Sequence, residues 1–250
     1  MATRGKLVPA KLKHDAIVEA ILEIRFDTTT IPEILFGKLA DYAPWKGFGQ
    51  RPMPASAVPA PIRQADPNLR FQPIFELLGS DGHLAVRIGP QVLSYHRMPP
   101  YVGWQRFQAE LSEEIDGLFE KANDLTVRRL GFRYLNALRP DLHGIRSISD
   151  LDLTVEIEGE KLAGNVNVNF TTQISDNTQC TVRIATTEFV QGVLPPNTSV
   201  VADVDVFTKE GFNTKDETEV KRWVELAHTK EKENFFRLLT DETIEALKES

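Results

Sequence analysis

The chain has 250 residues, of which 41% are hydrophobic and 26% charged, and its formal net charge is −7. This composition is typical of a globular protein that buries a core without disulfides, and the net negative charge disfavours binding to nucleic-acid phosphates. No apolar run approaches the ~20 residues of a membrane-spanning helix, and the N-terminal residues lack the pattern of a signal peptide. The single cysteine, Cys180, cannot form an internal disulfide, which favours a cytoplasmic protein.

The first fourteen residues differ in charge from the rest of the chain. They contain no acidic residue and four basic ones, so the remainder carries a net charge of −11; the basic residues are Arg4, Lys6, Lys11 and Lys13. We expect residues 1–14 to form a basic N-terminal arm. Such an arm is either solvated or in contact with nucleic acid or an acidic partner.

Residues 16–44 predict a strand followed by a helix. Apolar and polar side chains alternate over residues 16–26, which is the period of a strand with one buried face. Thr30 and Glu33 then match the pattern of a helix N-terminus, and the helical spacing ends at Pro44. The next segment, residues 44–68, holds six prolines and few periodic apolar residues, so we expect a long loop.

The remainder of the first half predicts several strands and a long helix. Glycine-rich turns separate the expected strands, which lie near residues 70–78, 83–88 and 91–97. From residue 101 the apolar period changes from two to 3.6, so a helix is expected over residues 101–122.

Residues 126–250 predict a similar order of elements. A strand over residues 126–138 precedes a short helix at 147–151. Further strands are expected at 153–158, 164–174, 179–188 and 200–207. A helix-start pattern at Thr214 and Glu217 precedes a long helix over 215–238, and a short last helix is expected at 241–247.

This order predicts an α+β fold in which antiparallel sheets carry long helices on one side. Residues 15–250 are expected to form a single domain with two related halves, at about 15–124 and 125–250. The element order is similar to that of TATA-binding-protein-like and helix-grip folds, in which one sheet face is free to bind. Large side chains of the long helices and of one strand are expected in the core: Trp104, Phe107, Leu111, Phe132, Trp223, Phe235 and Phe236.

The densest polar cluster inside a predicted strand lies at residues 128–136. Guanidinium groups bind phosphate and carboxylate in a forked geometry. We therefore predict ligand binding by four residues of this cluster: Arg129, Arg133, Tyr134 and Asn136. The alternative is that its arginines form structural ion pairs across strands with acids such as Glu19, Glu23 and Glu76.

Asp203 and Asp205 place two carboxylates on one face of a predicted strand, where they can share Mg²⁺ or Mn²⁺. The local spacing supplies no third ligand, and no histidine stands in zinc-ligand spacing with another histidine or with Cys180. We expect no cofactor, and we expect both aspartates to be solvated or ion-paired. Cys180 shares a strand face with apolar residues and is expected to be buried.

Several segments resemble a family of bacterial and archaeal proteins that has a sporadic distribution and no established activity. They are Ile17–Phe26 (IVEAILEIRF), Tyr101–Trp104 (YVGW), Val127–Asn136 (VRRLGFRYLN), Asp203–Phe207 (DVDVF) and Ala227–Thr240 (AHTKEKENFFRLLT). The most recognisable piece is Arg-Tyr-x-Asn, formed by Arg133, Tyr134 and Asn136. The resemblance implies no catalytic residue. A sporadic distribution implies horizontal transfer, which fits accessory genes such as defence or toxin–antitoxin modules.

Taken together, these features favour a non-enzymatic binding or interaction protein. The resemblance to that family implies the role of an accessory subunit in a mobile defence or toxin–antitoxin module. We expect a protein partner or self-association, no membrane association, and weak nucleic-acid binding at most because of the net charge. The alternative is a metal-dependent hydrolase or nuclease that uses Asp203 and Asp205, and small-ligand sensing is a third class of function.

Overall fold

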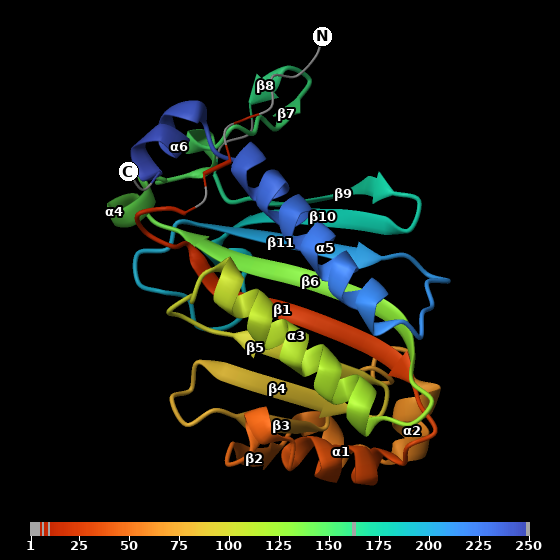
Figure 1. The fold of residues 1–250 in the computed structure, drawn as a ribbon. Coiled ribbons are helices and arrows are strands. Elements are labelled where there is room, and N and C mark those ends of the chain that lie inside the picture. Colours follow the sequence, from red (N-terminus) through yellow and green to blue (C-terminus); the bar gives the residue numbers. More distant parts are fainter. Residues whose placement is uncertain (1–5, 7, 10, 162–163, 249–250) are drawn as a thin grey trace. The chain divides into compact units, whose positions relative to one another are not determined.

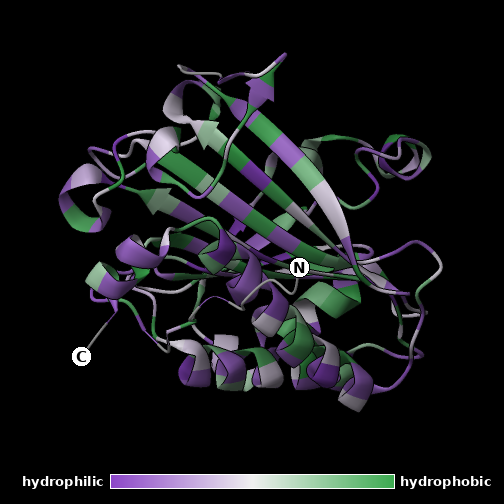
Figure 2. Ribbon diagram, turned by 90° about the horizontal axis from the view of Figure 1, so that it is seen from above, coloured by the Kyte–Doolittle hydropathy of each residue, from purple (hydrophilic) through white to green (hydrophobic). Residues whose placement is uncertain are grey.

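The computed structural model describes residues 6, 8–9, 11–161 and 164–248 (Figure 1). One sheet has the strand order β2-β3-β4-β5-β1-β6-β11-β10-β9, and a separate hairpin pairs β7 with β8. Helices pack on the large antiparallel sheet, so the α+β fold predicted from the sequence is confirmed. Along the strands, hydrophobic and hydrophilic residues alternate (Figure 2). No helix in the described part of the chain has both the length and the apolar composition needed to cross a bilayer.

The chain forms two compact units, and each draws on both of the halves predicted from the sequence. Unit 1 comprises Met1–Glu19, Arg133–Val206 and Ala227–Ser250. Unit 2 comprises Ala20–Phe132 and Phe207–Leu226. Four elements contribute residues to both units, namely β1 (Ile17–Asp27), β6 (Thr126–Leu138), β11 (Val200–Thr208) and α5 (Glu217–Arg237). The predicted likeness between residues 15–124 and 125–250 stays a prediction.

Unit 2 is built around an antiparallel run of strands. Its strands are β1 (Ile17–Asp27, of which Ala20–Asp27 belong to this unit), β2 (Gly49–Pro52), β3 (Phe75–Leu78), β4 (Leu84–Gly89) and β5 (Val92–Arg97). β1 pairs with β5, and β4 pairs with β5 and with β3, which in turn pairs with β2. Leu22, Ile24 and Phe26 are almost completely buried, because a period of two places every second residue of β1 on the core face.

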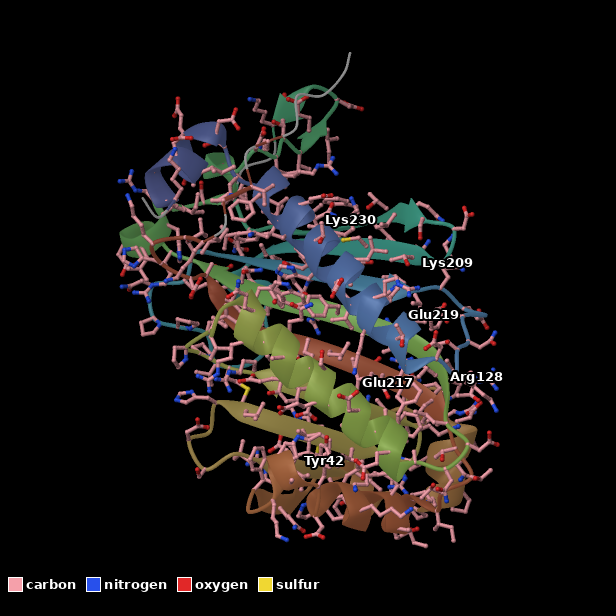
Figure 3. The ribbon with its side chains drawn as sticks, viewed as in Figure 1. Tyr42, Arg128, Lys209, Glu217, Glu219 and Lys230 are labelled. Carbon is pink, nitrogen blue, oxygen red and sulfur yellow. The ribbon has the colours of Figure 1, made fainter. Side chains whose placement is uncertain are left out.

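Helix α3 (Trp104–Lys121) covers this core with one apolar stripe. Phe107, Leu111, Ile115 and Leu118 recur at helical spacing and are buried. Helix α1 (Pro32–Ala40) contacts α3. A Cβ added at Gly117 would lie 2.5 Å from the ring of Tyr42 (labelled in Figure 3), so glycine there allows close packing against α3. Tyr42 also donates a hydrogen bond to the Glu113 carbonyl at 3.1 Å.

In unit 1, β9 (Asn167–Ser175) pairs antiparallel with β10 (Thr178–Thr186). The remaining elements of this unit are α4 (Pro140–His143), β7 (Glu156–Ile157), β8 (Glu160–Lys161) and α6 (Asp241–Leu247). The core combines the even-numbered residues of β10 and β11 with apolar residues of α5 and α6, among them Val182, Val204, Phe236 and Ile244. Cys180 is buried among them, as predicted.

Two residues of the predicted basic arm are held by unit 1. The Lys6 Nζ donates to the Leu239 carbonyl at 2.6 Å and forms an ion pair with Asp152. The Lys13 Nζ donates to the Ala246 carbonyl at 3.1 Å, and its backbone N–H donates to Leu247. Arg4 lies outside the described residues. Both lysines thus donate to backbone carbonyls in or just after the last turn of a helix, where cations are favoured by the helix dipole.

Several boundaries differ from the sequence-based expectation. Residues 44–68 are not a featureless loop, because they contain β2, the short helix α2 (Ala60–Ala65) and a 3-10 turn (Pro54–Ala57), and a second 3-10 turn (Ala43–Trp45) overlaps their start. The Thr30 hydroxyl does not cap α1; it accepts a hydrogen bond from the Asn123 backbone N–H at 2.7 Å. Two further 3-10 turns, at Ile148–Asp150 and Thr187–Phe189, lie in unit 1. Six of the seven predicted core side chains are buried, whereas Trp104, the first residue of α3, is only partly buried.

Candidate binding site

A pocket of about 330 Å³ opens on unit 1. Three neighbouring strands, β6, β11 and β10, each contribute two residues to its wall, spaced two apart. This spacing places them on the strand faces opposite the even-numbered core residues of the same strands, and three of them, Ala185, Val201 and Asp203, are themselves buried. The turn after β10 closes the remaining side. The lining residues are Arg133, Leu135, Arg183, Ala185, Phe189, Val190, Gln191, Val201 and Asp203.

An ion pair between Arg133 and Asp203 forms one polar part of the wall. The Arg133 Nε and Nη2 donate to the two carboxylate oxygens of Asp203, each at 2.6 Å. The Asp203 side chain is only 10% exposed, whereas that of Arg133 is 43% exposed. The hydrogen bond to Asp203 raises the pKa of Arg133 above its ordinary value. The fork therefore fixes a permanently charged guanidinium at the pocket, with one side turned to solvent.

Arg183 supplies a second guanidinium whose partners carry no charge. Its Nε donates to the side-chain oxygen of Asn167 at 2.9 Å, and its Nη2 donates to the Phe189 carbonyl at 2.7 Å. Neutral oxygens orient the group without neutralising it. Two cations and one carboxylate line the pocket, so the wall has an excess positive charge within an otherwise acidic protein.

The rest of the wall is mainly apolar. Leu135, Ala185, Val190 and Val201 line it together with the ring of Phe189, which is 45% exposed. Pockets for small groups in proteins are commonly apolar with a few fixed polar groups. The arrangement can therefore accept a group that combines a negative charge with a short apolar chain.

The four binding residues predicted from the sequence do not share one face. Tyr134 and Asn136 alternate with Arg133 along β6 and lie on the buried side. The Tyr134 ring lies 6.3 Å from the ring of His228 on α5, and the Asn136 amide donates to the Ala202 carbonyl at 3.3 Å. Arg133 lines the pocket. Ligand binding by Tyr134 and Asn136 stays a prediction.

Arg129 belongs to unit 2, where it takes part in ion pairing. Its Nη1 donates to Glu23 at 2.7 Å, and its guanidinium lies 5.1 Å from the centre of the Phe207 ring. A Cβ added at Gly131 would lie 2.9 Å from the Arg129 Nη1, so glycine there leaves room for this side chain. The ion pair between Arg129 and Glu23, one of the cross-strand pairs that the sequence offered as the alternative to ligand binding, is therefore present. Glu76 instead pairs with two other arginines, Arg51 and Arg87.

The predicted metal pair, Asp203 and Asp205, lies on one face of β11, but both Asp203 oxygens accept hydrogen bonds from Arg133. Asp205 acts on Arg133 through its charge and favours the charged guanidinium. Within the residues that the structure describes, no group of three histidine, cysteine or acidic side chains is arranged to hold a metal ion. Metal binding here would have to displace a fork of two short hydrogen bonds.

Sequence reasoning missed Arg183, Phe189 and Gln191. Arg183 occupies a strand position with the parity opposite to Val182 and Ile184, which marks it as outward-facing. Its closeness to Arg133 in the pocket depends on β11 lying between β6 and β10, which local patterns do not predict.

Comparison with models of known protein families gives no match for the chain, and comparison with curated proteins gives no significant match.

Proposed function

We propose that the chain is a non-enzymatic binding protein, and that its pocket receives the carboxyl-terminal residue of a partner protein. The observation that carries this proposal is the pair of guanidinium groups, from Arg133 and Arg183, around a pocket with a single carboxylate. A terminal carboxylate would bind at the guanidinium groups in forked geometry. An apolar side chain next to it would lie against the apolar wall, which includes Leu135 and Val201.

The size of the pocket supports a small group as the bound part of the partner. A volume of about 330 Å³ lies at the lower end of the roughly 300–1,000 Å³ that ligand pockets span. One terminal residue combines a charge and an apolar group within a few bonds. Nucleic-acid phosphates suit the pocket less well, because they carry no apolar group and meet an acidic protein at long range.

The wider role remains a proposal drawn from the resemblance described above. On that basis the protein is an accessory subunit in a horizontally mobile defence or toxin–antitoxin module and acts in the cytoplasm. A subunit of this kind recognises another protein of the same module, and a chain end is an accessible feature to recognise.

The proposal is tested with a random-sequence hexapeptide pool prepared with free and with amidated carboxyl termini. The immobilised protein is expected to retain the free-carboxylate pool preferentially. Arg183→Gln should abolish the preference, because it removes the charge while keeping hydrogen-bonding capacity. Arg128→Gln is the matched control, since that arginine pairs with Asp27 in unit 2 and lies outside the pocket. Equal retention of both pools would contradict the proposal.

A further inference from the structure

Strand β9 forms one edge of the large sheet and lacks the features that normally protect an edge. In the strand order it has one neighbour, β10, and its other side is the end of the sheet (Figure 1). Its nine residues, NVNFTTQIS, include no charge, no proline and no glycine. An exposed row of backbone N–H and C=O groups on such a strand is a template for pairing with another strand.

The opposite edge of the sheet shows the contrast. There β2 has four residues, Gly49–Pro52, and contains both a charge, Arg51, and Pro52. Short length, charge and proline are the usual means of preventing pairing between sheet edges. Among the residues that the structure describes, the short edge strand β2 is thus protected, whereas the longer edge strand β9 has no strand paired on its outer side.

The hydrogen-bond pattern defines which residues of β9 point their backbone groups outward. The Thr186 N–H donates to the Val166 carbonyl at 2.9 Å, so residue 166 exchanges hydrogen bonds with β10. Because antiparallel ladders alternate, the even-numbered residues that follow do the same. The odd-numbered residues Asn167, Asn169, Thr171 and Gln173 direct their N–H and C=O groups to the free edge.

We propose that β9 pairs antiparallel with β9 of a second copy of this chain, about a two-fold axis at Thr171. Thr171 is the central residue of the strand, so this register is symmetric about the middle of β9. It pairs Thr171 with its own copy and Asn169 with Gln173, and all of these residues have outward-directed backbone groups. A two-fold axis joins identical surfaces and gives a closed dimer.

The side chains of β9 suit this register. The pairs that exchange no hydrogen bonds place Val168 opposite Ile174, and Phe170 opposite Thr172, where side chains approach most closely. Phe170 is 38% exposed in the single chain, and pairing covers it. The odd-numbered side chains on the other face are uncharged and polar, so no like charges meet across the axis. This inference is independent of the pocket and of its proposed ligand.

Sedimentation velocity over a range of protein concentrations tests the inference. The wild-type chain is expected to form a dimer, and Thr171→Glu should weaken dimerisation roughly tenfold or more, because it places two carboxylates on the axis. Thr171 is exposed, so the variant keeps its core. Gln50→Glu on β2 adds the same charge to an exposed position of the other edge and should leave the dimer unchanged.

Cross-linking gives a second measurement. Thr171→Cys should yield a covalent dimer with a short bis-maleimide, whereas Gln50→Cys should not, and the native Cys180 is buried. A wild-type chain that stays monomeric would overturn the inference. A dimer that Thr171→Glu leaves intact, or that Gln50→Glu weakens equally, would also overturn it.

Discussion

Arg133 and Asp203 form a two-pronged ion pair, in which each carboxylate oxygen accepts one hydrogen bond at 2.6 Å. The two partners differ in environment, because the aspartate is almost buried and the arginine is partly exposed. Removing the arginine leaves a nearly buried carboxylate without its main partner. Removing an exposed arginine elsewhere on the same strand has no such consequence.

Arg133→Gln is therefore expected to lower the free energy of unfolding by about 1–3 kcal/mol, which is the usual cost of leaving a buried polar group without a hydrogen-bond partner. Arg128→Gln is the control, because Arg128 and Asp27 are about half exposed and such pairs contribute less than about 1 kcal/mol. Urea denaturation followed by circular dichroism measures both. Equal effects of the two substitutions would contradict the structural role of the pair.

Phe132→Ala is expected to cost about 3–5 kcal/mol of stability, because it opens a cavity in a packed core. Phe132 is completely buried in unit 2, and its ring lies 6.0 Å from that of Trp104 and 6.3 Å from that of Phe107. Trp104→Ala should cost less, since Trp104 is only partly buried. A melting temperature of Phe132→Ala equal to that of the wild type would refute the core placement.

Glu231 on α5 is buried, and burial raises its pKa well above the ordinary value for glutamate. A carboxyl with a raised pKa in the folded state binds its proton more tightly there, so its contribution to stability is present at low pH. That contribution is lost as the pH rises above the ordinary glutamate pKa and through the raised one. Glu231→Gln should therefore raise the melting temperature relative to the wild type at pH 8 more than at pH 4. A difference that is the same at both pH values would contradict this prediction.

Cys180 is predicted to be unreactive in the folded protein. Burial raises the pKa of its thiol to about 12, so almost no thiolate is present at pH 8. From the thiolate fraction alone, its reaction with a disulfide reagent such as DTNB should be roughly 10³-fold slower in the native state than in urea. Fast labelling of the native protein would show that the strand face carrying Cys180 is accessible.

Much of the fold could be predicted from the sequence, because its determinants are local. The alternation in residues 16–26 and 126–138 identified β1 and β6, and the helical spacing after residue 101 identified α3 to within a few residues. The elements within the Pro-rich segment 44–68 are harder to predict from the sequence, since a short strand such as β2 depends on pairing with a strand outside the segment, β3.

The candidate site was predictable only in part, for a related reason. Arg133 and Asp203 could each be singled out, yet their fork depends on the register between β6 and β11. Grouping Tyr134 and Asn136 with Arg133 followed chain proximity, whereas strand parity places them on opposite faces. Arg183 lies near Arg133 because β11 stands between β6 and β10 in the sheet, and no local sequence motif predicts that strand order.

The most direct test of the central claim is calorimetric titration with one hexapeptide retained from the free-carboxylate pool, compared with its amidated form. The wild-type protein should bind the free carboxylate roughly tenfold or more tightly, as expected for a charge-assisted forked contact worth about 1.4 kcal/mol or more. Arg183→Gln should bring the two affinities together, while Arg128→Gln should keep them apart. Equal affinity of the wild-type protein for both peptides would contradict a carboxylate site at Arg133 and Arg183.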